Sequence, residues 1–345
     1  MKTNSLYIAL LSLIALLSSC MDDVSMRTVV NTDGSCFREF SFPSDSAEMQ
    51  GGENMRDHIV PSFKTDGWEK TWAKNDSTEK LRCTASQQFA SVEEMAAKFP
   101  LQISGTPILK DCSFGKKFRW FYTEYTFTET YISLASGFSI PLSKYFDKDA
   151  LSYWFTGAPN LFEGMSGAEM KQYQDQFEEK YIDWIDANIV SDAIDVIASH
   201  YDLIADNPID LADFIAQRDS IISFAKEKQY SYINGKKHYG ELFSEFFHTN
   251  CFADSWQEGN ELYNALETRT GDYLSIATLS VDYQLSLPGK DFSFRLSGER
   301  LLTDDYTITA TSRQHNTWAY LVMILFVLLA VISFFFSKRS SQQDK

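Results

Sequence analysis

The chain has 345 residues, and its 31 Lys and Arg stand against 47 Asp and Glu, for a formal charge of −16. This acidic balance argues against a nucleic-acid partner, because phosphate binding depends on Lys and Arg that replace counterions. Apolar residues make up 44% of the chain, which is enough for a packed core and excludes wholesale disorder.

The N-terminus is typical of an exported protein. Lys2 precedes an apolar stretch from Leu6 to Leu17, and small residues follow, so residues 1–19 are predicted to be a signal peptide. Leu17-Ser18-Ser19-Cys20 resembles a bacterial lipobox. The resemblance implies a lipoprotein that is cleaved before Cys20 and carries diacylglycerol on its sulfur, together with fatty acids such as palmitate.

Residues 20–141 are predicted to be the β-rich part of the exported domain. Asp33-Gly34 lies between two β-prone runs and favours a hairpin over residues 24–42. A strand at 81–89 and a short helix that begins at Ser91 follow. The aromatic and Thr-rich run 117–134 is predicted to be one long strand.

The spacing of apolar residues becomes helical near residue 142, and residues 142–272 are predicted to be a helical block. Ser166 and Glu169 form a capping-box pattern before a long amphipathic stripe. The window 161–220 holds 14 acidic and three basic residues, a net charge of −11. We expect these charges on solvated outer faces.

Strands are expected again in residues 273–317, where they rejoin the sheet. The predicted fold class is therefore α+β: a β-rich module is interrupted by a mainly helical insertion and followed by a C-terminal transmembrane helix.

The run from Trp318 to Phe336 contains 19 residues without a charge. As a helix it would be about 28 Å long, close to the ~30 Å of a hydrocarbon core. Trp318 and Tyr320 suit the headgroup level at one end, and basic residues follow the other end. The sequence thus predicts a transmembrane helix over 318–336 and a cytoplasmic tail over 337–345.

Both ends of the exported domain therefore have an expected membrane anchor. Helical spans belong to inner membranes, so the predicted location is the bacterial inner membrane, with the main domain on its outer, periplasmic side. Few residues separate Cys20 from the first strand and the last strand from the span. We expect Val24 to lie close to Trp318, and residues 161–220 to lie on the side away from the membrane.

Four features of the chain occur together: the lipobox, Val-Asn-x-Asp-Gly-Ser at 30–35, Ser-Val-Glu-Glu at 91–94 and a single C-terminal span. Leu-Pro-Gly-Lys at 287–290 adds a fifth. In these the chain resembles LppM-type bacterial membrane lipoproteins, the family called DUF3153, over residues 20–135 and 276–340. The resemblance implies an α+β module of the cell envelope and carries over no catalytic residue.

Signatures of common catalytic chemistry are absent from the sequence, which has no His-Glu-x-x-His, Cys-x-x-Cys, P-loop or Gly-x-Gly-x-x-Gly. We assign no catalytic residue and no cofactor. His238, His248, Cys251 and Asp254 are of metal-ligand type, but aromatic neighbours favour packing, so no metal is predicted.

Aromatic residues are abundant, at 15% of the chain. They pack sheet cores or line surfaces that bind lipids or sugars. Trp120, Tyr122 and Tyr125 are the candidates for ligand-facing side chains.

Four cysteines remain after Cys20, and an exported compartment permits disulfides between them. Buried free thiols are the alternative. The four are Cys36, Cys83, Cys112 and Cys251.

The leading functional hypothesis is a non-enzymatic, membrane-anchored envelope module that binds a lipid, glycan or protein partner beside the membrane. Its expected partners are membrane lipid, both covalent and in the bilayer, and an envelope protein or hydrophobic ligand. The alternatives are a membrane-tethered hydrolase or transferase with an unfamiliar site, and an assembly subunit that uses the helical block.

Overall fold

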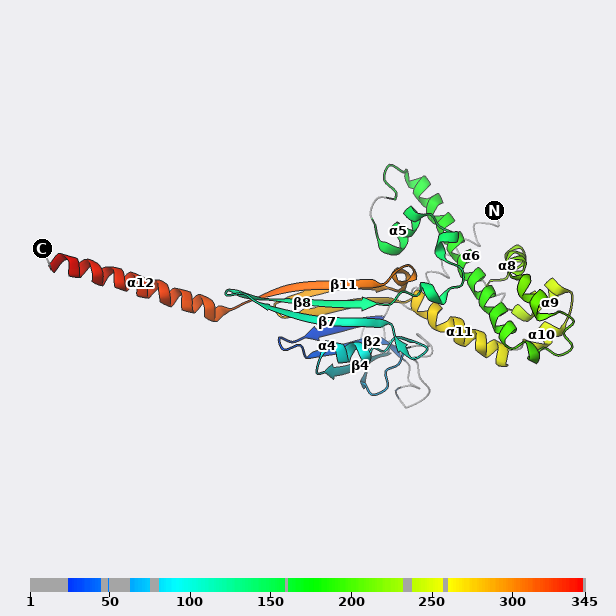
Figure 1. Cartoon of the computed structure of the whole chain (residues 1–345), viewed down its shortest axis with the longest axis horizontal. Coiled ribbons are helices and arrows are strands. Elements are labelled where there is room, and N and C mark those ends of the chain that lie inside the picture. Colours follow the sequence, from blue (N-terminus) through cyan, green and yellow to red (C-terminus); the bar gives the residue numbers. More distant parts are fainter. Residues whose placement is uncertain are drawn as a thin grey trace.

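The computed structural model describes residues 24–44, 49, 63–74, 81–158, 161–231, 238–256 and 260–343. The molecule is elongated, with its last helix at one end, the sheets in the middle and most other helices at the opposite end (Figure 1). The presence of both sheets and helices confirms the α+β class. The predicted signal peptide and Cys20 lie outside the described residues.

The larger sheet has six strands in the order β10-β9-β1-β2-β4-β3. β1 is parallel to β9, and every other neighbouring pair in this sheet is antiparallel. The predicted first hairpin is confirmed: Val30 pairs with Cys36, and Gly34 adopts the positive φ of 90° that the turn requires. The strands are β1 (Val24–Val30), β2 (Cys36–Ser44), β3 (Glu69–Lys74), β4 (Leu81–Phe89), β9 (Ser280–Leu287) and β10 (Lys290–Ser297).

A second, antiparallel sheet has the order β11-β8-β7 and consists of β7 (Leu109–Phe118), β8 (Tyr122–Tyr131) and β11 (Tyr306–His315). The prediction of one long strand over 117–134 is wrong, because the chain reverses at residues 119–121 and pairs β7 with β8. Phe118, Trp120 and Phe121, at and beside this turn, are exposed. Tyr125, Phe127 and Tyr131, farther along β8, are buried.

The two sheets pack through one face each. Alternate side chains of β8 are buried, and so are alternate side chains of β1, β2 and β9. The core between them is closed by helix α4 (Val92–Ala97) and by the small pair β5 (Gln102–Ile103) and β6 (Thr106–Pro107). We call this part, the described residues of 24–134 and 279–315, the stalk.

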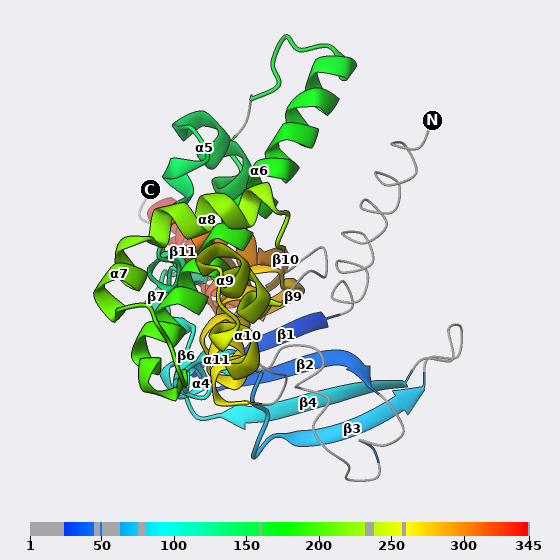
Figure 2. The ribbon, with the colours of Figure 1, turned by 90° about the vertical axis from the view of Figure 1, so that its right-hand side faces the viewer.

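The described residues of 142–277 form what we call the helical head (Figures 1 and 2). Ser166 caps its longest helix with the predicted capping box. α5 and the first half of α6 project to one side of the molecule (Figure 2). The helices are η2 (Leu142–Lys144), α5 (Lys148–Thr156), α6 (Gly167–Ser199), η3 (Tyr201–Leu203), α7 (Leu211–Ala216), α8 (Arg218–Glu227), α9 (Tyr239–Phe247), α10 (Cys251–Ser255) and α11 (Glu261–Ala277).

The chain enters and leaves the head through the stalk. The short helix η1 (Ala135–Gly137) follows β8, and β9 begins three residues after α11 ends. After the head, β9 joins the larger sheet beside β1, and β11 joins the smaller sheet beside β8. The short helix η4 (Gly298–Leu302) connects β10 to β11.

The last helix, α12 (Thr317–Gln343), is separated from β11 only by Asn316. Its window Thr317–Phe334 has a mean hydropathy of 2.5 and is 6% buried, so this helix is long and apolar enough to cross a membrane.

The register of the strands places Val24 and the start of α12 at opposite ends of the stalk. Val24 pairs with Val281, just after the head, whereas the far end of β9 leads to Pro288, whose carbonyl accepts a 2.9 Å hydrogen bond from Ser312 of β11. At about 3.3 Å per residue, the strand from Val281 to Pro288 alone spans roughly 23 Å. The expectation that Val24 lies near Trp318 is therefore wrong, because β1 runs parallel to β9 and begins at the head.

Candidate functional site

Exposed aromatic side chains gather where the β7–β8 hairpin meets the start of α12. The Phe118 ring stacks on Trp318 at a centroid distance of 6.3 Å, and the Trp120 ring meets Trp318 at 5.2 Å. Phe121 lies 5.2 Å from Tyr320. We call these five residues the aromatic collar. Their exposed fractions range from 36% for Tyr320 to 57% for Phe118, so they form an open apolar surface rather than a core.

Asn316 fixes the hairpin against the helix. Its Nδ2 donates to the carbonyl oxygens of Arg119 and Trp120 at 2.7 and 3.2 Å. Its backbone N–H donates to the carbonyl of Phe121 at 2.9 Å, and its Oδ1 accepts from the Thr123 hydroxyl at 3.1 Å. Asn316 thereby provides hydrogen-bond donors for the three backbone carbonyls of the turn and fixes the position of the turn relative to α12.

The same hairpin tip, residues 115–122, is basic. It contains Lys116, Lys117 and Arg119 and no acidic residue, and all three basic side chains are exposed. Lys116 Nζ lies 5.8 Å from the Tyr125 ring centroid. Within the described residues, Lys117 and Arg119 form no ion pair. A chain of charge −16 thus carries a concentrated positive charge beside its apolar helix.

The three ligand-facing candidates do not converge on one surface. Trp120 belongs to the collar. Tyr125 is 3% exposed, stacks on Phe114 at 5.8 Å and donates its hydroxyl to Gln314 at 3.3 Å. Tyr122 lies under the Arg313 guanidinium, 4.9 Å from its ring centroid. Of the three ligand-facing candidates, only Trp120 is therefore a collar residue. The sequence also singles out Trp318 and Tyr320, as interfacial residues of the span, but it does not single out Phe118 and Phe121.

A fully buried ion pair joins the two sheets of the stalk. The guanidinium of Arg38 on β2 contacts the carboxylate of Glu129 on β8, and neither side chain is exposed. Arg38 Nε donates to Thr28 at 2.9 Å, and the Tyr131 hydroxyl donates to Glu129 at 3.0 Å. Burial alone would lower the pKa of Arg38, but Glu129 raises it above its usual value, so the guanidinium stays charged. The pair orients the sheets and is enclosed by them.

The four cysteines are free thiols in the structure. Burial raises the pKa of the Cys36 thiol to about 11, and burial also raises the pKa of Cys112. Cys83 is buried and Cys251 is half-buried. The raised pKa values suppress the thiolate form, which is the reactive nucleophile.

Not every carboxylate of the head faces solvent as expected. Asp192 on α6 is 6% exposed, and burial raises its pKa to about 6, although Arg269 on α11 opposes the rise with a 3.0 Å ion pair. Arg218 on α8 contacts Asp195, which also lies 2.7 Å from Arg269. This network ties three helices together, so these aspartates have a structural role that charge patterning alone did not indicate.

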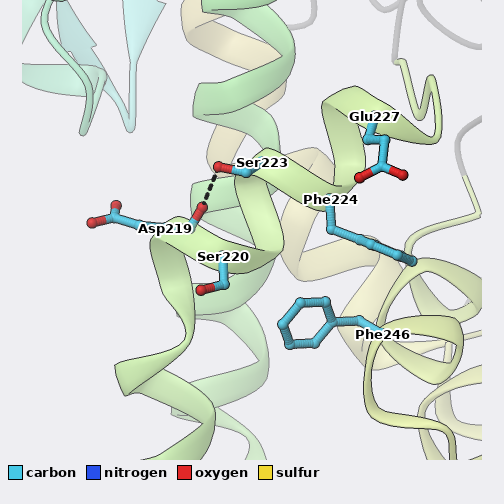
Figure 3. Close-up of a pocket in the computed structure, with 6 residues that line it drawn as sticks. All are labelled: Asp219, Ser220, Ser223, Phe224, Glu227 and Phe246. Carbon is cyan, nitrogen blue, oxygen red and sulfur yellow. Dashed lines mark hydrogen bonds between the residues drawn. The ribbon is translucent and has the colours of Figure 1, made fainter.

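Two surface depressions, one in the head and one where the head meets Ser104 of the stalk, contain no assembled catalytic group among the described residues. Figure 3 shows a shallow one between α8 and α9, in which Ser223 donates its hydroxyl to the backbone carbonyl of Asp219 at 2.8 Å. The rings of Phe224 and Phe246 close one side, 5.4 Å apart.

The second depression holds Ser199 and His200, 3.3 Å apart between Oγ and Nδ1. Ser199 donates to the Asp195 carbonyl at 2.8 Å, and Nδ1 lies 3.0 Å from the Val196 carbonyl. A ring nitrogen that donates to a carbonyl cannot accept the serine proton. This arrangement is therefore a helix end rather than a nucleophile with its base.

No group of three or more His, Cys, Asp or Glu side chains converges to hold a metal among the residues that the structure describes. The Cys251 thiol instead lies 3.7 Å from Asn207 Oδ1. In comparisons with known proteins, the chain matches no family model, no curated protein and no solved structure.

Proposed function

We propose that the protein is a single-span envelope protein whose stalk holds the helical head away from the membrane, where the head binds another protein. The helical head is in this proposal an insertion between β8 and β9 of the stalk. The expected signal peptide and the basic tail support a head on the outer, periplasmic side. The protein acts through binding and has no catalytic step.

The observation that carries this proposal is the placement of the head and α12 at opposite ends of the stalk (Figure 1). β7 and β8 extend from the head to the collar as one continuous hairpin, and β11 runs beside them into α12. The buried ion pair between the two sheets of the stalk holds them rigidly together, so the stalk keeps the head at a fixed distance from α12.

An apolar surface on the head suits a protein partner. Leu211 and Ile215 lie four residues apart on α7 and are 37% and 42% exposed, and Leu203 is 44% exposed. Residues at this spacing share one helix face. Among the described residues, large exposed hydrophobic side chains outside the collar and α12 are few: Met49, Met170, Leu203, Leu211 and Ile215.

The charges around this surface indicate the chemistry of the partner. Residues 202–213 contain four aspartates and no Lys or Arg. Electrostatic complementarity favours a partner with an apolar centre and a basic rim, and it disfavours the acidic headgroups of a membrane.

Native mass spectrometry of the full chain, extracted with its membrane, tests the proposal. A bound protein should appear as a companion mass with the wild type and disappear with the double variant L211K/I215K, which removes the apolar face and offsets two of the four local negative charges. The matched control is S220K on α8, which adds a charge to the head outside this face and should keep the companion.

A wild type without a companion would contradict the proposal. A companion that survives L211K/I215K would equally contradict it. Unchanged thermal unfolding of both variants shows that the head is intact, since the substituted side chains are exposed.

A further inference from the structure

We infer that the basic aromatic hairpin tip, residues 115–122, inserts into the headgroup layer of the membrane that α12 spans and selects anionic phospholipids there. This surface is separate from the head, and the inference does not depend on the head having a protein partner.

The depth of the tip follows from its contacts with α12. Trp and Tyr at the end of a spanning helix occupy the headgroup level. The rings of Phe118, Trp120 and Phe121 lie 5.2 to 6.3 Å from Trp318 or Tyr320. Side chains at this distance share the depth of the helix end, so the tip reaches the interface together with the first turn of α12.

The exposed apolar area is explained by this position. In water, Phe118 and Trp120 would leave at least half of their surface exposed on a protein with a well-packed core. In the interface, the same rings are covered by lipid, as amphipathic aromatic side chains prefer.

The charges of the tip favour anionic lipid over neutral lipid. Lys116, Lys117 and Arg119 flank Phe118 in the same hairpin tip, so their ammonium and guanidinium groups lie near the level of the phosphates when the rings are in the interface. Two acidic groups lie close to the tip. Glu124 pairs with Arg313 at 2.9 Å. Asp33 accepts the Ser35 hydroxyl at 2.7 Å and interacts electrostatically with Lys116, so Lys117 and Arg119 are the tip cations without an ion pair among the described residues.

The hairpin is also held in place before it meets lipid. The four hydrogen bonds of Asn316 connect the turn to the start of α12. A preorganised surface spends little conformational entropy on binding, which favours a specific contact over a loose electrostatic one.

Depth-dependent quenching in vesicles of phosphatidylcholine and phosphatidylglycerol tests the insertion. The full chain carries C20S and C251S, the three buried thiols stay unmodified, and an environment-sensitive fluorophore is attached to F118C. Spin-labelled phosphatidylcholine should quench this probe strongly. The matched control is D111C on the same strand, about 24 Å farther along β7, and it should not be quenched.

The headgroup selectivity is tested by the lipids that stay bound to the extracted chain in native mass spectrometry. An interfacial basic residue contributes about 1 kcal/mol towards anionic lipid, or roughly a fivefold preference. K117Q should lower the ratio of bound phosphatidylglycerol to phosphatidylcholine about fivefold, and K116Q/K117Q/R119Q should lower it further. K148Q in the head is the control and should leave the ratio unchanged.

Equal quenching at positions 118 and 111, or none at 118, would overturn the insertion. The insertion would also be overturned if the fluorescence of the probe at position 118 did not change with the spin-labelled lipid but changed with the number of protein molecules per vesicle. That result would indicate that the collar contacts a second copy of the chain. A triple variant with the wild-type lipid ratio would overturn the selectivity.

Discussion

Arg38 and Glu129 place two opposite charges at the centre of a dry interface. Removal of one partner from such a pair leaves an uncompensated buried charge and costs about 3–5 kcal/mol, whereas replacement of both by apolar residues costs far less. We expect E129Q to lower the free energy of unfolding by about 3–5 kcal/mol and R38M/E129L to recover most of that loss. Urea unfolding of the detergent-solubilised chain, followed by tryptophan fluorescence, measures both.

A smaller loss for E129Q than for the double variant would show that the carboxylate does not stabilise Arg38. The neighbouring tyrosines offer an internal check. Y131F removes only the 3.0 Å hydrogen bond to Glu129 and should cost about 1 kcal/mol.

Asp192 makes the stability of the head depend on pH. Because its pKa is raised from the ordinary 3.8 to about 6, the folded state binds this proton more tightly than the unfolded state. The contribution of Asp192 to stability is therefore largest below pH 4 and declines as the pH rises through 6. Because the side chain at position 192 of D192N cannot ionise, the free energy of unfolding of this variant, relative to that of the wild type, should rise by up to about 3 kcal/mol between pH 4 and pH 7.

Thermal unfolding of D192N and the wild type across this pH range measures the difference. A gap that stays constant with pH would contradict the expected titration of Asp192.

The alternation of inward and outward side chains along β2 and β8 was enough to predict that Arg38 and Glu129 are buried. In β2, Arg38 shares the inward face with Cys36, Phe40 and Phe42, and Glu129 shares its face with Phe127 and Tyr131. A charged residue at an inward position predicts a buried partner. The identity of that partner was not predictable, because it lies on the other sheet and 91 positions away in the chain.

At the scale of elements, the β9–β10 turn shows how closely the two sheets approach. Gly289 has a φ of +87°, and a Cβ built there would lie 2.7 Å from the backbone oxygen of Arg313. Gly67 has a similar φ of +80° with nothing within 4 Å of such a Cβ. In both alanine variants the positive φ should lower the free energy of unfolding by about 1 kcal/mol. G289A should cost about 1–3 kcal/mol more, because β11 must also shift.

Paired unfolding curves of G289A and G67A separate backbone strain from the steric contact. Equal losses would show that the turn does not press against β11.

Local signals in the sequence predicted several elements. Asp33-Gly34 predicted the first hairpin, and Ser166 with Glu169 predicted the start of α6. Local signals did not predict the turn between β7 and β8, because residues 119–121 are Arg, Trp and Phe instead of Gly, Asn or Asp. Asn316, which satisfies the carbonyls of that turn, lies almost two hundred positions later, so no local pattern could reveal it. The resemblance to DUF3153 lipoproteins stays a prediction.

At the scale of the whole molecule, the position of Val24 changes how the two expected anchors act. A lipid on Cys20 would be tethered at the head end of the stalk, and three intervening residues reach only about 10 Å. With β1 in its sheet, this lipid cannot share a leaflet with the start of α12. We therefore expect α12 alone to hold the protein in its membrane.

C20A should accordingly remain in the membrane fraction after cell lysis and a carbonate wash. The control is L325R/L329R, which places two charges in the middle of the span at about 2.5–3.5 kcal/mol each and should release the protein. Release of C20A, or retention of the double arginine variant, would assign the anchoring to the lipid.

In the proposed exported protein, the pairing of β1 with β9 and of β8 with β11 also sets an order for folding during secretion. The N-terminal strands emerge first, but Val24 must wait for Val281 and Tyr122 for His315. Contacts this distant in sequence form slowly, and unpaired strand edges attract other chains meanwhile. We expect the head to assemble early from its own neighbouring helices. The stalk would close only as β11 leaves the translocation channel, when α12, which begins two residues after β11 ends, is already inside the channel. In this proposal, completion of the fold coincides with entry of α12 into the bilayer, and we expect a chain that ends before Tyr306 to carry the head on an incomplete stalk.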